Sequence, residues 1–231
     1  MVAQALRADA GSRQAGRRSP YDHGVRLYYR PGSGRPVRVA WLLEEIGAPY
    51  EPVSLSTAET TESEHLARHP LGRVPVLETD EGELLFESTA ICLDLGDRYP
   101  EAGVLAPVRS RDRALVYQWS VFAMTELEPA ILEFARHSDG DPERAAAGAD
   151  RFGAGAAVLE RALDGREFLV ADHLTVADVV TGGVLGLAAR RGLLPAPAYP
   201  SVNDYVSRLI ERPAFRRAVA ATESSLAQLI A

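Results

Sequence analysis

The sequence predicts an α/β domain at residues 25–101 followed by an all-helical domain at residues 108–225. In the first range, short runs of β-favouring residues alternate with stretches of helical periodicity. In the second, apolar residues recur only at helical spacing. The pattern changes around Pro100 and Pro107, which is typical of a boundary between domains. We therefore expect one chain with two unlike domains.

The first domain begins with a strand, a helix and a second strand. Val25–Tyr29 is rich in β-favouring residues and is followed by a Pro-Gly turn. Arg35–Ile46 has apolar residues at helical spacing, with Gly47 after it as a stop signal. A second β-favouring run covers residues 50–55. This order of elements favours two parallel neighbours in a sheet.

The first domain continues with a short helix, a hairpin and a longer helix. The short helix ends at Arg68. Two β-favouring runs at 74–78 and 83–86 flank the turn residues 80–82, which predicts an antiparallel pair. The longer helix is expected at about residues 87–99.

The second domain is predicted to consist of helices alone. Thr175 and Asp178 are three residues apart at the start of one of them, where a hydroxyl and a carboxylate form a variant of the capping box. Three long helices and two shorter ones are expected at residues 114–137, 145–163, 175–190, 202–210 and 214–220.

Composition restricts the class of partner. The formal net charge of −7 argues against nucleic acid as the main partner, although local clusters among the arginines can still bind a small anion. No apolar run approaches the roughly 20 residues of a membrane span, so no membrane partner is expected. The only cysteine, Cys92, excludes an internal disulfide and fits a cytoplasmic location. The five histidines lack ligand spacing, so we expect no metal.

Residues 1–24 differ from the rest of the chain. Arginines stand there among alanine, glycine, serine and glutamine, and the apolar segment of a secretory signal is missing. This composition predicts a disordered extension. An organelle transit peptide, which is also rich in arginine and poor in acids, is the alternative.

Four short motifs are more specific than the order of elements. They are LYYRPGS (27–33) with RVAWLLEEIG (38–47), HPLGRVPVL (69–77), ESTAI (87–91) with DRYP (97–100), and LTVAD (174–178). In this order they resemble the cytosolic glutathione-transferase superfamily, over residues 25–220. The resemblance implies an α/β thioredoxin-like N-terminal domain plus an all-α C-terminal domain, the glutathione-transferase fold. It also implies glutathione as a co-substrate and a homodimer.

The resemblance further implies which residues bind glutathione. A cis bond between Val74 and Pro75 would turn the Val74 backbone outward to pair with an extended peptide, whereas the alternative is an ordinary edge-strand proline. Ser88, at a helix start, would bind the γ-glutamyl carboxylate, and Glu87 matches an acidic position of the motif. Both residues also suit a plain helix cap. At the glycyl end this sequence departs from the branches that place a histidine or lysine near the third-strand motif, because Arg73 stands there; Arg73 either pairs with the glycyl carboxylate or points into solvent.

The chemistry requires a thiolate, whereas a free thiol has a pKa of about 8.5. A hydroxyl that donates to the sulfur, together with the positive end of the following helix, would lower this pKa. Ser33 matches the serine-using branch and is preferred, while Tyr29 matches the tyrosine-using branches. Cys92 lies inside a helix and is expected to be a core residue rather than a reactive thiol.

The second-substrate pocket is expected between the activating hydroxyl and the first long helix of the second domain. The resemblance suggests Tyr117, Phe122 and Met124 as lining residues, but side chains at helical spacing also form cores. Arg35 and Arg38 are further candidates for positive potential near glutathione.

The expected function is that of a cytoplasmic glutathione transferase, which activates the thiolate for attack on a small electrophile. Related glutathione-dependent enzymes, such as a dehalogenase, an isomerase or a peroxidase, need the same thiolate and stay open as alternatives. A non-catalytic binding module with the same fold is the third hypothesis.

Overall fold

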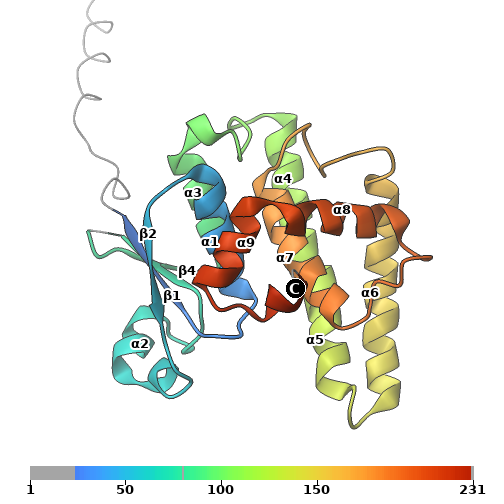
Figure 1. The fold of residues 1–231 in the computed structure, drawn as a ribbon, viewed down its shortest axis with the longest axis horizontal. Coiled ribbons are helices and arrows are strands. Elements are labelled where there is room, and N and C mark those ends of the chain that lie inside the picture. Colours follow the sequence, from blue (N-terminus) through green and yellow to red (C-terminus); the bar gives the residue numbers. More distant parts are fainter. Residues whose placement is uncertain (1–23, 80, 230–231) are drawn as a thin grey trace, which may run out of the picture.

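The computed structural model describes residues 24–79 and 81–229, so the predicted extension at 1–24 lies, apart from Gly24, outside the described residues. A four-stranded sheet stands on one side of the molecule and a group of long helices on the other (Figure 1). This is the predicted fold class, an α/β part followed by a helical part. None of the described helices combines the length and apolar character needed to cross a membrane.

The sheet contains β1 (Val25–Tyr29), β2 (Tyr50–Ser54), β3 (Val76–Glu78) and β4 (Leu84–Phe86), in the order β2-β1-β3-β4. β1 and β2 are parallel, whereas β3 is antiparallel to both β1 and β4. The predicted parallel pair and hairpin are therefore confirmed. The third strand begins later than predicted, after Pro75, because proline has no N–H for the ladder.

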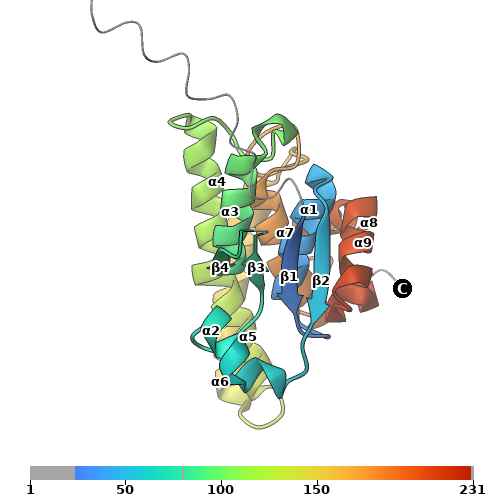
Figure 2. The same cartoon turned by 90° about the vertical axis from the view of Figure 1, so that its left-hand side faces the viewer.

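Successive residues of β1 point to opposite faces of the sheet. Leu27 belongs to the main core, with residues of α1 (Arg35–Ile46) and α3 (Ser88–Arg98). Tyr28 belongs to a separate cluster on the other face, where its ring contacts a histidine of α2 (Ser63–Arg68). Figure 2 looks onto this second face, with α2 and the strands in front of α1.

α1 is the element on which both halves of the molecule pack. Its residues 36–43 are all buried, with the sheet and α3 beside it in the first domain and α7 (Val176–Arg190) and α9 (Pro213–Ala221) beside it in the second. The Trp41 ring meets Phe215 of α9 edge to face, with ring centroids 5.1 Å apart. Such close packing holds the start of α1 in place relative to both domains.

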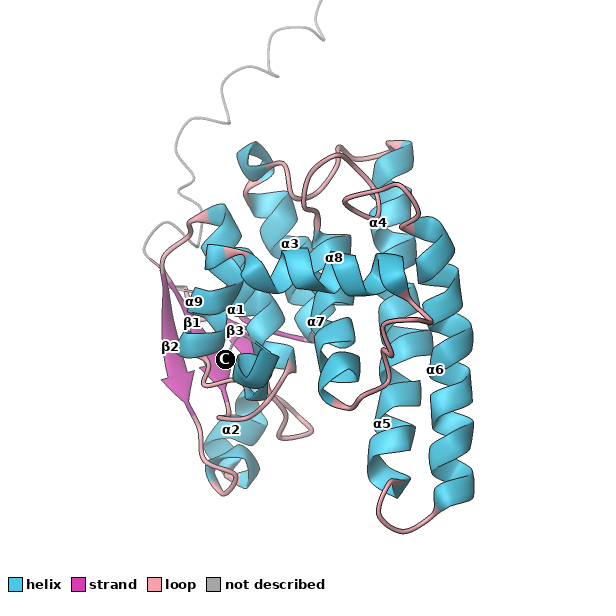
Figure 3. Cartoon of the chain, turned by 45° about the vertical axis from the view of Figure 1, so that its right-hand side comes forward, coloured by secondary structure: helices cyan, strands magenta, loops and turns pink. Residues whose placement is uncertain are grey.

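The other helices of the second domain are α4 (Arg111–Phe122), α5 (Glu128–His137), α6 (Pro142–Ala162) and α8 (Pro200–Glu211). α5 and α6 pack side by side as an antiparallel pair (Figure 1). α8 contacts both α6 and α7 and crosses over them (Figure 3). These helices enclose the larger core.

The sequence predicts one regular helix at 114–137, but the structure divides this stretch into two helices. A π-helical turn at Ala123–Leu127 separates α4 from α5. Pro129 accounts for the irregularity, because it has no N–H and its ring would clash with the carbonyl of Thr125 in a regular helix. The wider turn ends at Glu128, which reaches the seam between the domains.

The predicted capping box at the start of α7 is present, formed by Thr175 and Asp178. The Asp178 carboxylate is fully buried. It accepts hydrogen bonds from the N–H groups of Leu169 and Thr175 and from the Tyr205 hydroxyl of α8. The start of α7 is thus closed by protein groups and ties three segments together.

Candidate functional site

A cavity of about 690 Å³ lies at the seam between the two domains. On the α/β side its wall consists of the loop after β1, the start of α1, Thr60 in the segment before α2, and the segment before β3. On the helical side its wall consists of α5, α7 and the C-terminal segment that follows α9. The cavity therefore has one wall from each domain.

Ser33 lines this cavity directly before α1. The chain turns there at Gly32, whose φ of 80° is free of strain only for glycine, and the Ser33 N–H donates to the Arg30 carbonyl. The C-terminal segment holds the loop, since the Gly32 N–H donates to the Glu223 carbonyl and the Ser224 hydroxyl donates to the Ser33 carbonyl at 3.1 Å. Ser33 thus stands at the positive end of a helix, where an anion is stabilised.

Tyr29, the competing hydroxyl, is placed differently. It is buried, it is not part of the cavity wall, and its hydroxyl donates to Glu223 at 2.7 Å. Burial, followed by the hydrogen bond to Glu223, raises the pKa of Tyr29. The structure therefore brings Ser33, but not Tyr29, to the cavity.

The segment before β3 forms the opposite edge of this wall. The Val74–Pro75 peptide bond is cis, as predicted; Val74 and Arg73 line the cavity, and Pro75 is buried behind them. Gly72 has a φ of 59°, and a Cβ there would lie 2.5 Å from the carbonyl oxygen of Thr60. Only glycine fits this close approach, so the backbone has a defined path where it borders the cavity.

The start of α3 has an unusual backbone. Glu87 has a φ of 72°, where a residue other than glycine is strained, and no side chain of the described residues caps this helix. Ser88 is 2% exposed, with its hydroxyl 3.4 Å from Nη1 of Arg38. Neither Glu87 nor Ser88 lines the cavity itself, whereas Arg38 does. Arg38 therefore lies between the start of α3 and the cavity, because it contacts Ser88 and also lines the cavity.

A buried group of charges joins the two walls. Glu128 of α5 is 4% exposed and lies between two arginines of α1, with distances of 2.6 Å to Arg38 Nη2 and 2.7 Å to Arg35 Nη2. Burial by itself would raise the pKa of Glu128, but Arg38 and Arg35 outweigh it and lower this pKa. Arg38 Nε is buried without a hydrogen-bond partner among the described residues.

Sequence reasoning had proposed both arginines as sources of positive potential and had missed Glu128. An acidic residue on the buried side of an otherwise apolar helical stretch was the available signal, because a buried carboxylate needs a cationic partner.

The three residues predicted for the second-substrate pocket lie outside this cavity. Tyr117 accepts a hydrogen bond from Arg113 at 2.6 Å, Phe122 packs edge to face on Trp119, and Met124 Sδ lies 3.1 Å from Arg38 Nη1. The helical wall of the cavity is formed instead by residues of α5 and α7 and by Arg191 directly after α7. They are Glu128, Leu132, Arg136, Gly183, Leu187, Arg190 and Arg191, and Ser225 of the C-terminal segment completes this wall.

Cys92 is fully buried inside α3, and its thiol contacts the Arg38 carbonyl at 3.7 Å. Burial raises the pKa of this thiol to about 12. A thiol of this kind stays protonated near neutral pH and is a poor nucleophile. Its placement agrees with the predicted core role.

The family follows from comparison with known proteins. The model of the glutathione S-transferase N-terminal domain matches residues 23–94, and that of the glutathione S-transferase C-terminal domain matches residues 122–213. The chain therefore belongs to the glutathione S-transferase family, as the four motifs indicated.

The matches to individual relatives extend over nearly the full length of those relatives. The chain is 31% identical to maleylacetoacetate isomerase of Pseudomonas aeruginosa, over 83% of this chain and 92% of that protein. It is 30% identical to glutathione S-transferase 1 of Zea mays, over 87% of this chain and 98% of that protein. A sphingomonad glutathione S-transferase, solved in complex with glutathione, superposes with a TM-score of 0.76 at 30% identity, covering 85% of this chain and 98% of that one.

Proposed function

We propose that this protein binds glutathione in the seam cavity and that Ser33 activates its thiol for attack on a small electrophile. The observation that carries the proposal is the placement of Ser33, in the cavity wall and at the positive end of α1. Lowering the thiol pKa by two units from about 8.5 requires roughly 2.7 kcal/mol of differential stabilisation. A hydroxyl that donates to the sulfur, the helix end and nearby arginines together can supply it.

The remainder of glutathione is proposed to bind along the α/β wall. The Val74 backbone pairs with the peptide, and Arg73 beside it pairs with the glycyl carboxylate. The γ-glutamyl carboxylate lies at the start of α3, near Ser88 and Arg38. The unpartnered Nε of Arg38 supports this placement, because a buried donor needs an acceptor and a carboxylate provides one. Glu87 is available for the γ-glutamyl amine.

In the proposed transfer, the sulfur forms a bond to an electrophilic carbon. A leaving group departs with the electron pair of the bond that breaks, while the thiol proton passes to solvent. Isomerisation is the second candidate, since a relative 31% identical to this chain is named maleylacetoacetate isomerase. There the thiolate adds to a carbon–carbon double bond, rotation follows, and elimination releases the glutathione unchanged.

Paired substitutions test the activating group. Ser33→Ala should raise the pKa of the bound thiol, measured by the ultraviolet absorbance of thiolate against pH, and should lower kcat/KM about 100-fold at neutral pH. Tyr29→Phe should leave the pKa of the bound thiol nearly unchanged and kcat/KM within about threefold, because the Tyr29 hydroxyl is bonded to Glu223.

If Tyr29→Phe had the larger effect on the thiol pKa and on kcat/KM, Tyr29 would be the activating group instead of Ser33. Calorimetry that detects no binding of glutathione to the unmodified protein would reject the proposal. If glutathione binds but neither substitution changes the turnover of any electrophile, the protein is a binding module.

We also propose that the protein works as a cytoplasmic homodimer. Exposed apolar residues support an interface on both domains, namely Leu84 and Phe86 on β4 and Tyr117 and Val121 on α4. The sedimentation mass should be twice the 24.9 kDa of the chain. Val121→Glu should shift it toward the monomer, while a single species of chain mass in the unmodified protein would rule the dimer out.

A further inference from the structure

The seam cavity is strongly basic, although the protein as a whole is acidic. Among the described residues, seven arginines and one glutamate line it, so its wall carries six more positive than negative charges. Glutathione with an ionised thiol has a net charge of about −2. The cavity therefore has more positive charge than glutathione neutralises.

Much of this surplus lies on the helical wall. The two arginines of α1 are already paired with the buried glutamate. Arg190 and Arg191, at the end of α7, make no ion pair with any described residue, and Arg136 of α5 has only a long contact of 3.9 Å with Glu133. These three arginines, called here the rear arginines, line the wall of the cavity that the helical domain supplies, whereas glutathione is proposed to bind along the α/β wall.

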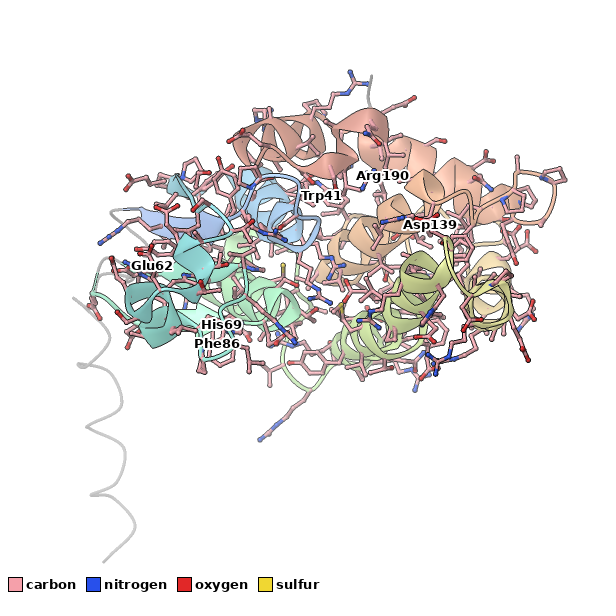
Figure 4. All side chains as sticks on the ribbon, turned by 90° about the horizontal axis from the view of Figure 1, so that it is seen from below. Trp41, Glu62, His69, Phe86, Asp139 and Arg190 are labelled. Atoms are coloured by element: carbon pink, nitrogen blue, oxygen red, sulfur yellow. The ribbon has the colours of Figure 1, made fainter. Side chains whose placement is uncertain are left out.

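One of the rear arginines is held in place. Arg190 is half-buried, donates to the Ser225 hydroxyl at 2.8 Å and lies 3.2 Å from the Gln228 amide oxygen. Arg190 is labelled in Figure 4. Both partners are neutral, so the positive charge of Arg190 is positioned but not balanced. Burial and the neighbouring Arg191 lower the pKa of Arg190, which is the direction expected for an uncompensated cation.

The same wall also has an apolar part. Leu132 precedes Arg136 by one helical turn, and Leu187 precedes Arg191 by the same spacing. Along α5, and along α7 and the residue that follows it, a leucine and an arginine one turn later therefore both line the cavity. This pattern suits a small molecule with an apolar body and an anionic end.

We propose that the second substrate of this protein carries a carboxylate, which the rear arginines bind while the leucines contact its body. Guanidinium groups pair with carboxylates in two-point geometry, so they would orient the electrophilic carbon as well as attract the substrate. This inference rests on the proposed function for the chemical step, but the binding that it predicts is measurable without turnover.

Two aryl chlorides that differ only in a distant charge provide the test. N-(4-chloro-3-nitrobenzoyl)glycine has a carboxylate, and the corresponding glycinamide does not. In both, the glutathione sulfur bonds to the ring carbon and chloride leaves with its electron pair. The acid should exceed the amide in kcat/KM by about tenfold, the effect of one charge-assisted hydrogen bond. The preference should shrink in 0.5 M salt.

Two matched substitutions locate the effect. Arg136 and Arg144 are both about two-thirds exposed, and each lies 3.9 Å from an acid three residues earlier, but only Arg136 lines the cavity. Arg136→Gln should therefore reduce the preference for the acid, and Arg144→Gln should keep it. The double variant Arg190→Gln, Arg191→Gln should abolish it.

Calorimetry of the acid and the amide separates this inference from the proposed function. If the acid binds more tightly than the amide and the double variant loses the difference, the carboxylate subsite stands, even where no glutathione is turned over. If glutathione binds and is conjugated but the acid and the amide behave alike, the subsite is overturned while the transferase stands. A preference that survives in the double variant also overturns it.

Discussion

The starts of α3 and α7 use similar residues in opposite ways. Each combines a hydroxyl with an acid, Ser88 beside Glu87 and Thr175 with Asp178. At α7 both members of the pair bond to the backbone in a capping box. At α3 no side chain in the described part of the chain caps the helix, and Glu87 is held at a φ of 72°. One helix start is closed by the protein and the other is left open.

We interpret the closed start of α7 as a contribution to stability and the open start of α3 as a binding site. The first N–H groups of a helix have no partner within the helix and must be bonded by something else. At α7, Thr175 and Asp178 serve them, so this end stabilises the fold. At α3, beside a basic cavity, we propose that the carboxylate of glutathione serves them. The strained backbone of Glu87 is the kind that persists where function requires it.

The largest expected effect is at the closed helix start. Asp178→Ala should lower the free energy of unfolding by about 4 kcal/mol, because four buried donors lose their acceptor, namely the N–H groups of Leu169 and Thr175 and the hydroxyls of Thr175 and Tyr205. Urea denaturation at neutral pH measures it. The exposed Asp172 in the preceding loop gives the control, since Asp172→Ala should change stability by less than about 0.5 kcal/mol.

A loss below about 1 kcal/mol in the Asp178 variant would contradict the view that this helix end is structural. At a temperature where the variant is still folded, its affinity for glutathione should match that of the unmodified protein.

A smaller effect, of a different kind, is expected at the open helix start. Ser88→Ala should weaken glutathione about tenfold, equivalent to about 1.4 kcal/mol, because the ligand carboxylate loses one hydrogen bond. The free energy of unfolding should fall by less than about 1 kcal/mol, since the only hydrogen bond that this hydroxyl makes with a described residue, to Arg38, is long. Calorimetry and urea denaturation of one preparation give both quantities.

The smallest effect completes the pair. Thr175→Ala removes the corresponding hydroxyl at α7 and should cost about 1 kcal/mol of stability, the usual value for a helix cap, with no change in glutathione affinity. If Thr175→Ala weakened glutathione as much as Ser88→Ala does, the proposed division between an open and a closed helix start would be wrong.

Much of the fold was predictable because its signals are local. α1 has the predicted bounds, since a helical period and a glycine stop are both read within the segment itself. The capping box needs only residues three apart, and the hairpin of β3 and β4 needs only two β-favouring runs around a turn.

The lining of the cavity was harder to predict, and the first long helix shows why. Its π-helical turn adds a residue to one turn, which rotates the side chains that follow by about 100° relative to a regular helix. Tyr117 and Phe122 precede this turn and lie elsewhere, while Leu132 and Arg136 follow it and line the cavity. Periodicity assumes a regular helix, so it does not reveal such a change of face.

The sequence by itself determined the order of the elements, their caps and the motifs of the α/β wall, because these depend on residues within a few positions of one another. Only the tertiary structure decided that Glu128 lies between Arg35 and Arg38 and that Tyr29 bonds to Glu223. These partners are 90 or more residues apart in the chain. Their contact depends on how α1 packs against the helical domain, and no local pattern encodes that packing.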